Sequence, residues 1–214
     1  MRRPHLRSAC LALPLLLGAS CANLPLTETG FLGDYSALEE APDAEVWGIP
    51  DSVKLYRSAS LDAGGYDAVL VEPAVWMASP EHGFRPSEER TQWLLEEFST
   101  CLEKGLGKDF EVVDAPRAGA LRVRPAMTAV EPANPWINVP LIFLILPLDM
   151  GGLSGEIEIV DAMTGERVFA MTARRESNPF LWLEAFTWYG QARHAMWKWS
   201  RLMADRLQPA EARP

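Results

Sequence analysis

The sequence predicts a single α+β domain in which two long helices cover one face of a mixed or antiparallel sheet of four or five strands. Two segments, residues 87–105 and 184–207, carry apolar side chains at the spacing of an amphipathic helix. Between them lie several short segments with the composition or alternation of strands. The chain has 214 residues, which is enough for one domain with a substantial core.

Residues 1–20 have the pattern of a lipoprotein signal peptide. Three arginines precede an apolar run at residues 9–17, which is less than half of the roughly 20 residues that span a bilayer. The sequence Leu-Gly-Ala-Ser before Cys21 resembles the bacterial lipobox, in which the chain is cut before a lipid-modified cysteine. We therefore expect lipid attachment at Cys21. A plain secretory signal cut near Ala19 or Ser20 would instead leave a soluble periplasmic protein with a free thiol.

Lipid attachment would decide where the protein is located. Several acyl chains, at about 0.8 kcal/mol per buried methylene, hold a protein on a membrane almost permanently. Ala22 follows the cysteine, and in the lipoproteins that this N-terminus resembles an aspartate at that position favours retention in the inner membrane. The sequence therefore predicts a protein that is anchored in the outer membrane and faces the periplasm.

Residues 21–65 are predicted to form a lipidated tether followed by an extended arm. Pro25, Pro42 and Pro50 would interrupt a helix there. Apolar and aromatic side chains recur along this part of the chain, which is unusual for a solvated linker. We expect the arm to lie on the face of the sheet that the helices leave open. Residues 66–208 then form the α+β domain, and residues 209–214 a disordered tail.

Five segments are predicted to form strands. Residues 67–77 contain an unbroken apolar run, which is typical of a strand buried on both faces. The others are short or alternate apolar with charged residues: 110–113, 120–130, 155–161 and 167–175. The last two are predicted to pair as a hairpin with Gly165 in the turn.

Charged residues alternate along two of these strands. Arg122 and Arg124 lie on one, and Glu156 and Glu158 lie on another. We expect them to form a ladder of ion pairs on an exposed face of the sheet, worth at most about 1 kcal/mol per pair.

Both predicted helices have a buried stripe, which in the second helix includes Trp188, and one tryptophan outside it. Ser87 followed by two glutamates is a favourable N-terminus for the first helix. Cys101 falls in the middle of that helix's apolar stripe, so we expect a buried and unreactive thiol. Trp93 on the first helix and Trp197 on the second lie away from the stripes and are candidates for an interaction surface.

Residues 136–150 contain an apolar run, residues 142–146, which lies between Pro140 and Pro147. The segment is too short to span a membrane. One interpretation is a buried connection or a short core strand. The other is an apolar loop that docks on a partner protein, on a second copy of the chain, or on the bilayer. Its candidate interaction residues are Trp136, Ile142, Phe143, Leu144, Ile145 and Leu146.

Three motifs relate the chain to a known family. They are Gly-Phe-Leu-Gly-Asp-Tyr-Ser at residues 30–36, Tyr-Asp-Ala-Val-Leu-Val-Glu-Pro at residues 66–73, and Asp-Ala-Met-Thr-Gly-Glu at residues 161–166. With these motifs the chain resembles the bacterial lipoproteins grouped as domain of unknown function 3313, over roughly residues 30–207. The resemblance implies an envelope lipoprotein and implies no reaction.

The charge of the chain excludes one class of partner. The formal net charge is −9, and removal of residues 1–20 takes away three arginines and no acid, which leaves −12. A polyanion such as nucleic acid needs clustered basic residues, so we expect no nucleic acid partner. Cys101 would be the only cysteine besides Cys21, which leaves no intramolecular disulfide.

The sequence contains no recognisable catalytic arrangement. His82 and His194 do not have the spacing of a helical zinc site, so we expect neither a metal nor a cofactor. Ser154 lies in a Gly-Leu-Ser-Gly stretch that is one residue short of a nucleophile elbow. We expect a non-catalytic interaction or accessory subunit of a cell-envelope assembly, with an envelope protein or a second copy as partner. The alternatives are a carrier of a small apolar ligand, suggested by eight tryptophans, and a hydrolase that uses Ser154.

Overall fold

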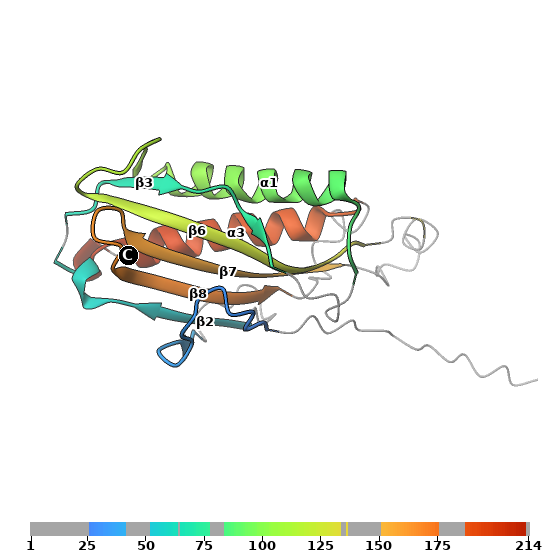
Figure 1. The fold of residues 1–214 in the computed structure, drawn as a ribbon, viewed down its shortest axis with the longest axis horizontal. Helices are drawn as coiled ribbons and strands as arrows, with labels where there is room; N and C mark the ends of the chain where they lie inside the picture. The colour runs from blue at the N-terminus through green and yellow to red at the C-terminus, as the bar shows by residue number, and fades with distance from the viewer. Residues whose placement is uncertain are drawn as a thin grey trace, which may run out of the picture.

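The computed structural model describes residues 26–41, 52–63, 65–77, 84–133, 136, 151–175 and 187–212. Within these residues the chain forms a mixed sheet of eight strands and two long helices, α1 (Glu88–Leu106) and α3 (Gly190–Leu207). Both helices lie on the same face of the sheet (Figure 1). The predicted α+β class and helical layer are confirmed, whereas the predicted number of four or five strands is wrong.

The centre of the sheet is antiparallel and one side of it is parallel. The strands follow the order β1-β2-β8-β7-β6-β3-β5, and β4 pairs with β6 beyond the end of β3. Strands β3 and β4 run parallel to β6, and β3 also runs parallel to β5. Their bounds are β1 (Glu39–Glu40), β2 (Ser52–Arg57), β3 (Ala68–Val71), β4 (Val75–Trp76), β5 (Glu111–Val112), β6 (Ala120–Glu131), β7 (Gly152–Asp161) and β8 (Arg167–Arg175).

The additional strands have two physical origins. Strand β2 comes from the predicted arm and pairs along its whole length with β8, so it extends the sheet instead of covering a face. The predicted strand at residues 67–77 is split around Pro73, which has no N–H to donate. Val71 pairs with Val123 and Val75 pairs with Ala126, so the break between β3 and β4 absorbs one extra residue.

The hairpin of β7 and β8 forms as predicted. Gly165 has φ +73°, the left-handed conformation that the turn requires. The Asp161 side chain accepts hydrogen bonds from the backbone N–H groups of Met163 and Thr164 at 2.9 and 2.8 Å. These bonds lower the pKa of Asp161, because they stabilise its charged form.

The two helices pack side by side and run in the same direction. Arg193 Nε donates to Glu97 at 2.7 Å, and Arg201 donates to the carbonyl oxygen of Gly105 at 3.3 Å. Helix α1 begins after Ser87, whose side chain accepts from the backbone N–H of Arg90, as predicted.

Helix α3 starts later than predicted. It begins at Gly190 without a capping side chain, and residues 187–189 form a turn before it. The predicted start at residue 184 lies outside the described residues.

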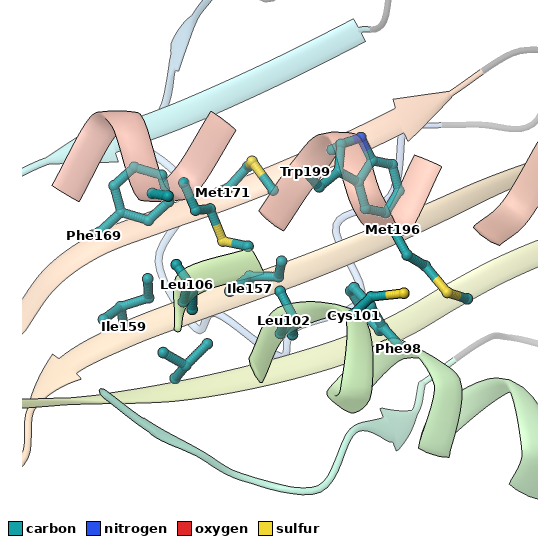
Figure 2. Close-up of a cluster of buried hydrophobic side chains, with 14 of the residues drawn as sticks. Phe98, Cys101, Leu102, Leu106, Ile157, Ile159, Phe169, Met171, Met196 and Trp199 are labelled. Atoms are coloured by element: carbon teal, nitrogen blue, oxygen red, sulfur yellow. The ribbon is translucent and has the colours of Figure 1, made fainter. Parts of the chain in front are cut away.

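The core fills the space between the helices and the sheet (Figure 2). Phe98 on α1 and Trp199 on α3 meet edge to face, with ring centroids 6.3 Å apart. Gly155 on β7 lets the indole ring approach the sheet, because a Cβ there would lie 3.1 Å from a Trp199 ring atom. The members of this cluster drawn in Figure 2 include Phe98, Cys101, Leu102, Leu106, Ile157, Ile159, Phe169, Met171, Met196 and Trp199.

The first part of the arm covers the opposite face of the sheet, as predicted. Thr27 donates from its hydroxyl to Thr128 on β6 at 2.6 Å, and its carbonyl oxygen accepts from Thr172 on β8 at 3.0 Å. The backbone N–H of Thr29 donates to Glu156 on β7 at 2.9 Å. Three neighbouring strands therefore hold this segment in place.

The C-terminal end is bound at the sheet edge next to β2. Arg57 donates to the carbonyl oxygens of Arg206 and Gln208 at 2.7 and 3.0 Å, and the backbone N–H of Ala210 donates to Asp62 at 3.0 Å. Residues Ala210–Ala212 form a short 3-10 helix, so part of the predicted disordered tail is ordered. A guanidinium group that satisfies two carbonyl oxygens at the end of α3 explains this order.

The close approach of the two helices at Gly105 generates a prediction. A Cβ at Gly105 would lie 2.4 Å from Ser200 Cβ, so Gly105→Ala should lower the free energy of unfolding by about 1–3 kcal/mol although alanine is the better helix former. In a Ser200→Gly background the same change should cost nothing or should stabilise. Urea denaturation of the four proteins measures this coupling. Additive effects of the two changes would contradict the packing described here.

Candidate functional site

The structure describes some of the predicted interaction residues and not others. Cys21 and the apolar residues 142–146 lie outside the described part of the chain. Trp136 is described and is 77% exposed. Trp93 is half-buried, and Trp197 is 38% exposed. The predicted tryptophans therefore occupy three different environments.

Trp93 on α1 contacts the residue that precedes α3. Its ring packs against that of Tyr189, which precedes α3, with centroids 6.0 Å apart. The guanidinium group of Arg90 lies over both rings, 5.4 and 5.5 Å from their centroids. Trp93 also packs against the main core. Its described contacts are thus structural ones within the domain.

Trp197 is presented on the outer side of α3. Lys108, in the turn after α1, places its ammonium group 4.8 Å from the centre of the indole ring. Nearby, Arg201 pairs with Asp109 at 3.0 Å. An exposed aromatic ring with a charged border is the arrangement that protein interfaces favour at their centres.

Trp188 is exposed in the structure, although the sequence predicts that it is buried. The sequence placed Trp188 on the buried stripe of a helix that was predicted to start at residue 184. Because α3 starts at Gly190, Trp188 lies in a turn and is 48% exposed. Its carbonyl oxygen accepts from the backbone N–H of Ala133 at 3.0 Å. No side chain caps the first turn of α3. The sequence therefore contains no capping signal that would place the start of the helix at Gly190.

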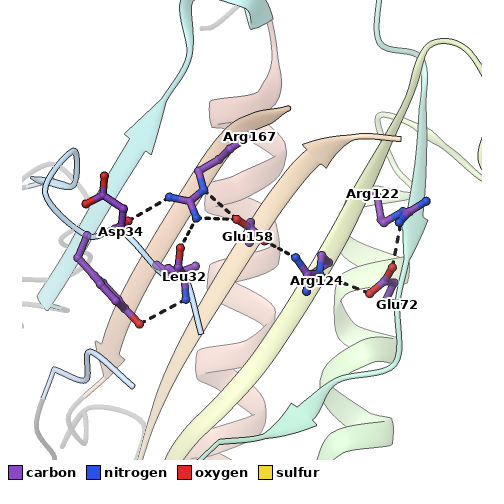
Figure 3. A network of polar contacts seen from close by, with 8 residues as sticks. Leu32, Asp34, Glu72, Arg122, Arg124, Glu158 and Arg167 are labelled. Atoms are coloured by element: carbon purple, nitrogen blue, oxygen red, sulfur yellow. Dashed lines mark hydrogen bonds and ion pairs between the residues drawn. The ribbon is translucent and has the colours of Figure 1, made fainter. Parts of the chain in front are cut away.

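A network of charged residues crosses the sheet on the arm side (Figure 3). Glu158 binds Arg124 at 2.5 Å and Arg167 at 2.7 Å, and Glu72 lies 3.7 Å from Arg124. Arg167 also donates to the carbonyl oxygens of Leu32 and Asp34 in the arm. One pair of the predicted ladder, Arg124 with Glu158, is confirmed. The rest is wrong: Arg122 lies 3.6 Å from Glu72, and Glu156 accepts hydrogen bonds from the arm.

The predicted exposure of the ladder is wrong for its glutamates, whereas the side chain of Arg124 is 43% exposed. The side chain of Glu158 is 9% exposed, and Glu156 is fully buried. The glutamates are buried because the arm covers this face of the sheet. The arm forms hydrogen bonds with β6 and β8, the two neighbours of β7.

Glu156 and Tyr35 make a part-buried polar contact between arm and sheet. The Tyr35 hydroxyl donates to Glu156 at 2.5 Å and accepts from the backbone N–H of Gly30 at 2.9 Å. Burial and the neighbouring carboxylate raise the pKa of Tyr35, since both disfavour a phenolate. The phenol therefore stays protonated and keeps donating. This arrangement holds the arm in place on the sheet.

A groove runs between the end of β3 and the outer side of α1. Its volume is about 370 Å³, and its lining mixes apolar side chains with glutamates and hydroxyl groups. Ser99 on α1 crosses it, accepting from the backbone N–H of Ala74 at 2.9 Å and donating to the carbonyl oxygen of Leu95 at 3.1 Å. The lining residues are Val71, Pro73, Ala74, Gln92, Leu95, Glu96, Ser99, Thr100 and Glu103.

The residues considered for catalysis lie in structural positions. Ser154 is fully buried inside strand β7 and does not lie at a strand-to-helix turn. Burial, together with the nearby Glu97 carboxylate, raises the pKa of the Cys101 thiol to about 11, so the thiol stays protonated at neutral pH. Among the described residues, no three His, Cys, Asp or Glu side chains come together as a metal site. No helix that the structure describes is long and apolar enough to cross a membrane.

The fold is that of an α+β protein with a sheet packed between a helical layer and a polar arm. The chain belongs to the family described as "Protein of unknown function (DUF3313)", whose model matches residues 27–203. This confirms the resemblance that the three sequence motifs indicated. No curated protein matches the chain.

Similarity to solved structures is distant. The chain is similar to the PelC dodecamer from Paraburkholderia phytofirmans in two crystal forms, one of them a point variant, at 12% and 11% sequence identity. The TM-score is 0.45 in both cases, and the match covers 75% of this chain and 99% of that chain. Values this low carry no argument about the assembly or function of this chain.

The network around Glu158 generates a second prediction. Glu158→Ala should lower the free energy of unfolding by about 1–3 kcal/mol, because two partly solvated guanidinium groups lose their shared carboxylate. Glu166→Ala, an exposed position in the turn of the same hairpin, should change it by less than about 0.5 kcal/mol. Thermal and urea unfolding of both variants checks this. Equal effects of the two changes would contradict the structural role of Glu158.

Proposed function

We propose that this chain is a lipoprotein, anchored through Cys21 in the outer membrane and facing the periplasm, that acts as a non-catalytic interaction or accessory subunit of a cell-envelope assembly. The observation that supports the interaction role best is the exposure of Trp197 on α3, which is 38%. Tryptophan side chains bury a large area and are enriched at the centres of protein interfaces.

Trp197 is the residue at which a partner protein is proposed to dock. It projects from the outer side of the helical layer, and Lys108 holds the ring through a cation–π contact. Two ion pairs connect α3 with α1 and the turn that follows it: Arg193 with Glu97 and Arg201 with Asp109. A central aromatic side chain with a polar rim excludes water when a partner covers it. The partner is an envelope protein or a second copy of this chain.

The other functions considered from the sequence have weaker support. A carrier would need an apolar cavity, whereas the groove beside α1 has glutamates in its lining. At the Gly155 contact with Trp199, the space between α3 and the sheet is filled. A hydrolase would need an accessible nucleophile, and Ser154 is fully buried.

Crosslinking tests the proposal in the membranes of the source cell. A photoreactive amino acid at position 197 should give a discrete protein adduct, and one at the exposed position Thr164, in the β7–β8 turn, should give none. Fatty-acid labelling in the same cells should mark the wild-type chain and fail with Cys21→Ser. Labelling of the Cys21→Ser chain would refute the anchor. Absence of an adduct at position 197, or equal adducts at both positions, would refute the partner surface.

A further inference from the structure

Helices α1 and α3 begin at the same end of the molecule (Figure 1). Five large exposed apolar side chains lie in the chain segments next to that end: in and after β4, before α1, after the end of β6 and before α3. Met77 follows β4 and donates from its backbone N–H to Met127 on β6 at 2.9 Å. Phe84 lies three residues before the cap of α1, and Trp188 lies two residues before α3. Their exposed fractions are Val75 42%, Met77 37%, Phe84 46%, Trp136 77% and Trp188 48%.

The tether reaches the domain near this same end. Thr27 is fixed by hydrogen bonds to Thr128 and Thr172. Six residue steps separate Cys21 from Thr27, so the connection spans at most about 21 Å.

The opposite end of the sheet is out of reach of that tether. Ala120, where β6 begins, lies eight residues before Thr128, which is about 26 Å along a strand. A lipid attached to Cys21 could not enter a bilayer that faced this far end. The end that carries Trp188 lies within reach.

We propose that the end of the domain defined by Val75, Met77, Phe84, Trp136 and Trp188 rests on the bilayer and places these side chains in its interfacial layer. The inference depends on the proposed lipid anchor at Cys21. Tryptophan suits this layer, because its ring combines an apolar body with a polar N–H group that favours the headgroup level. Phenylalanine, methionine and valine add apolar area that can enter the boundary with the acyl chains.

The charge of the protein determines what kind of contact this is. A mature chain with a net charge of −12 gains nothing from anionic headgroups, so the contact depends on apolar and aromatic side chains. Exposed charges of both signs border the patch, with Glu88, Glu89 and Arg90 in the first turn of α1. High salt should therefore not weaken the contact.

The outer side of α3 is left free by this orientation. Trp197 lies two helical turns beyond Gly190, which is about 10 Å further from the bilayer end. The membrane contact and the proposed partner surface are thus separate, and Trp197 provides a matched control for Trp188.

The experiment uses the lipidated full chain in vesicles of phosphatidylethanolamine and phosphatidylglycerol, with no other protein present. A photoreactive amino acid replaces Trp188 in one sample and Trp197 in another. Mass spectrometry should find lipid adducts at position 188 in about tenfold higher yield than at position 197, at low and at high salt. Flotation of the wild type and of Cys21→Ser shows whether the anchor holds the protein on the vesicles.

The outcomes separate the two proposals. Equal lipid adducts at the two positions, or protein adducts in place of lipid at position 188, would overturn the orientation while the anchor stands. Failure of the wild-type chain to float, or flotation of Cys21→Ser to the same extent, would overturn the anchor and with it the orientation.

Discussion

Two carboxylates, Glu156 and Glu158, lie on the face of the sheet that the helices do not cover, and both are buried there. Burying a carboxylate is costly unless hydrogen bonds or opposite charges replace its water. Tyr35 and Thr29 supply hydrogen bonds to Glu156, and Arg124 and Arg167 supply charge to Glu158. The arm is therefore required for this face to be stable.

The two faces of the sheet use different interactions for the same purpose. The helical face is closed by apolar packing, and Gly105 and Gly155 allow Ser200 and Trp199 to approach closely. The arm face is closed by hydrogen bonds and ion pairs. Because polar contacts are directional, they fix the register of the arm, and Thr27 is held where β6 and β8 can both bind it. That position determines where a membrane tether joins the domain.

Local patterns in the sequence predicted local structure well. The cap at Ser87 and the turn at Gly165 were correct, because each depends on neighbouring residues alone. The sequence placed the residues of β2 in the arm and did not predict a strand there. The pairing of β2 with β8 joins residues more than a hundred positions apart, so no local pattern indicates it. The burial of Glu156 was missed for the same reason. Alternation of charge indicates which side chains share a face, and it does not indicate what covers that face.

The candidate site was predicted less well than the fold. Exposed tryptophans were expected, but Trp93 packs between the helices and Trp188 was placed on a buried stripe. Periodicity cannot locate the start of a helix that has no capping residue. The proposed roles of Trp188 and Trp197 follow from where α3 begins, which became visible only in the packed structure.

Binding of the arm to the sheet is the central claim, because the arm closes one face of the sheet and sets the length of the tether. Amide hydrogen exchange of the full chain tests it most directly. The backbone N–H of Thr29, bound to Glu156, should exchange at least about tenfold slower than in an unfolded chain. Tyr35→Phe should accelerate it and leave the amides of α1 unchanged. Exchange of the Thr29 amide at the unfolded rate in the wild-type protein would contradict the account.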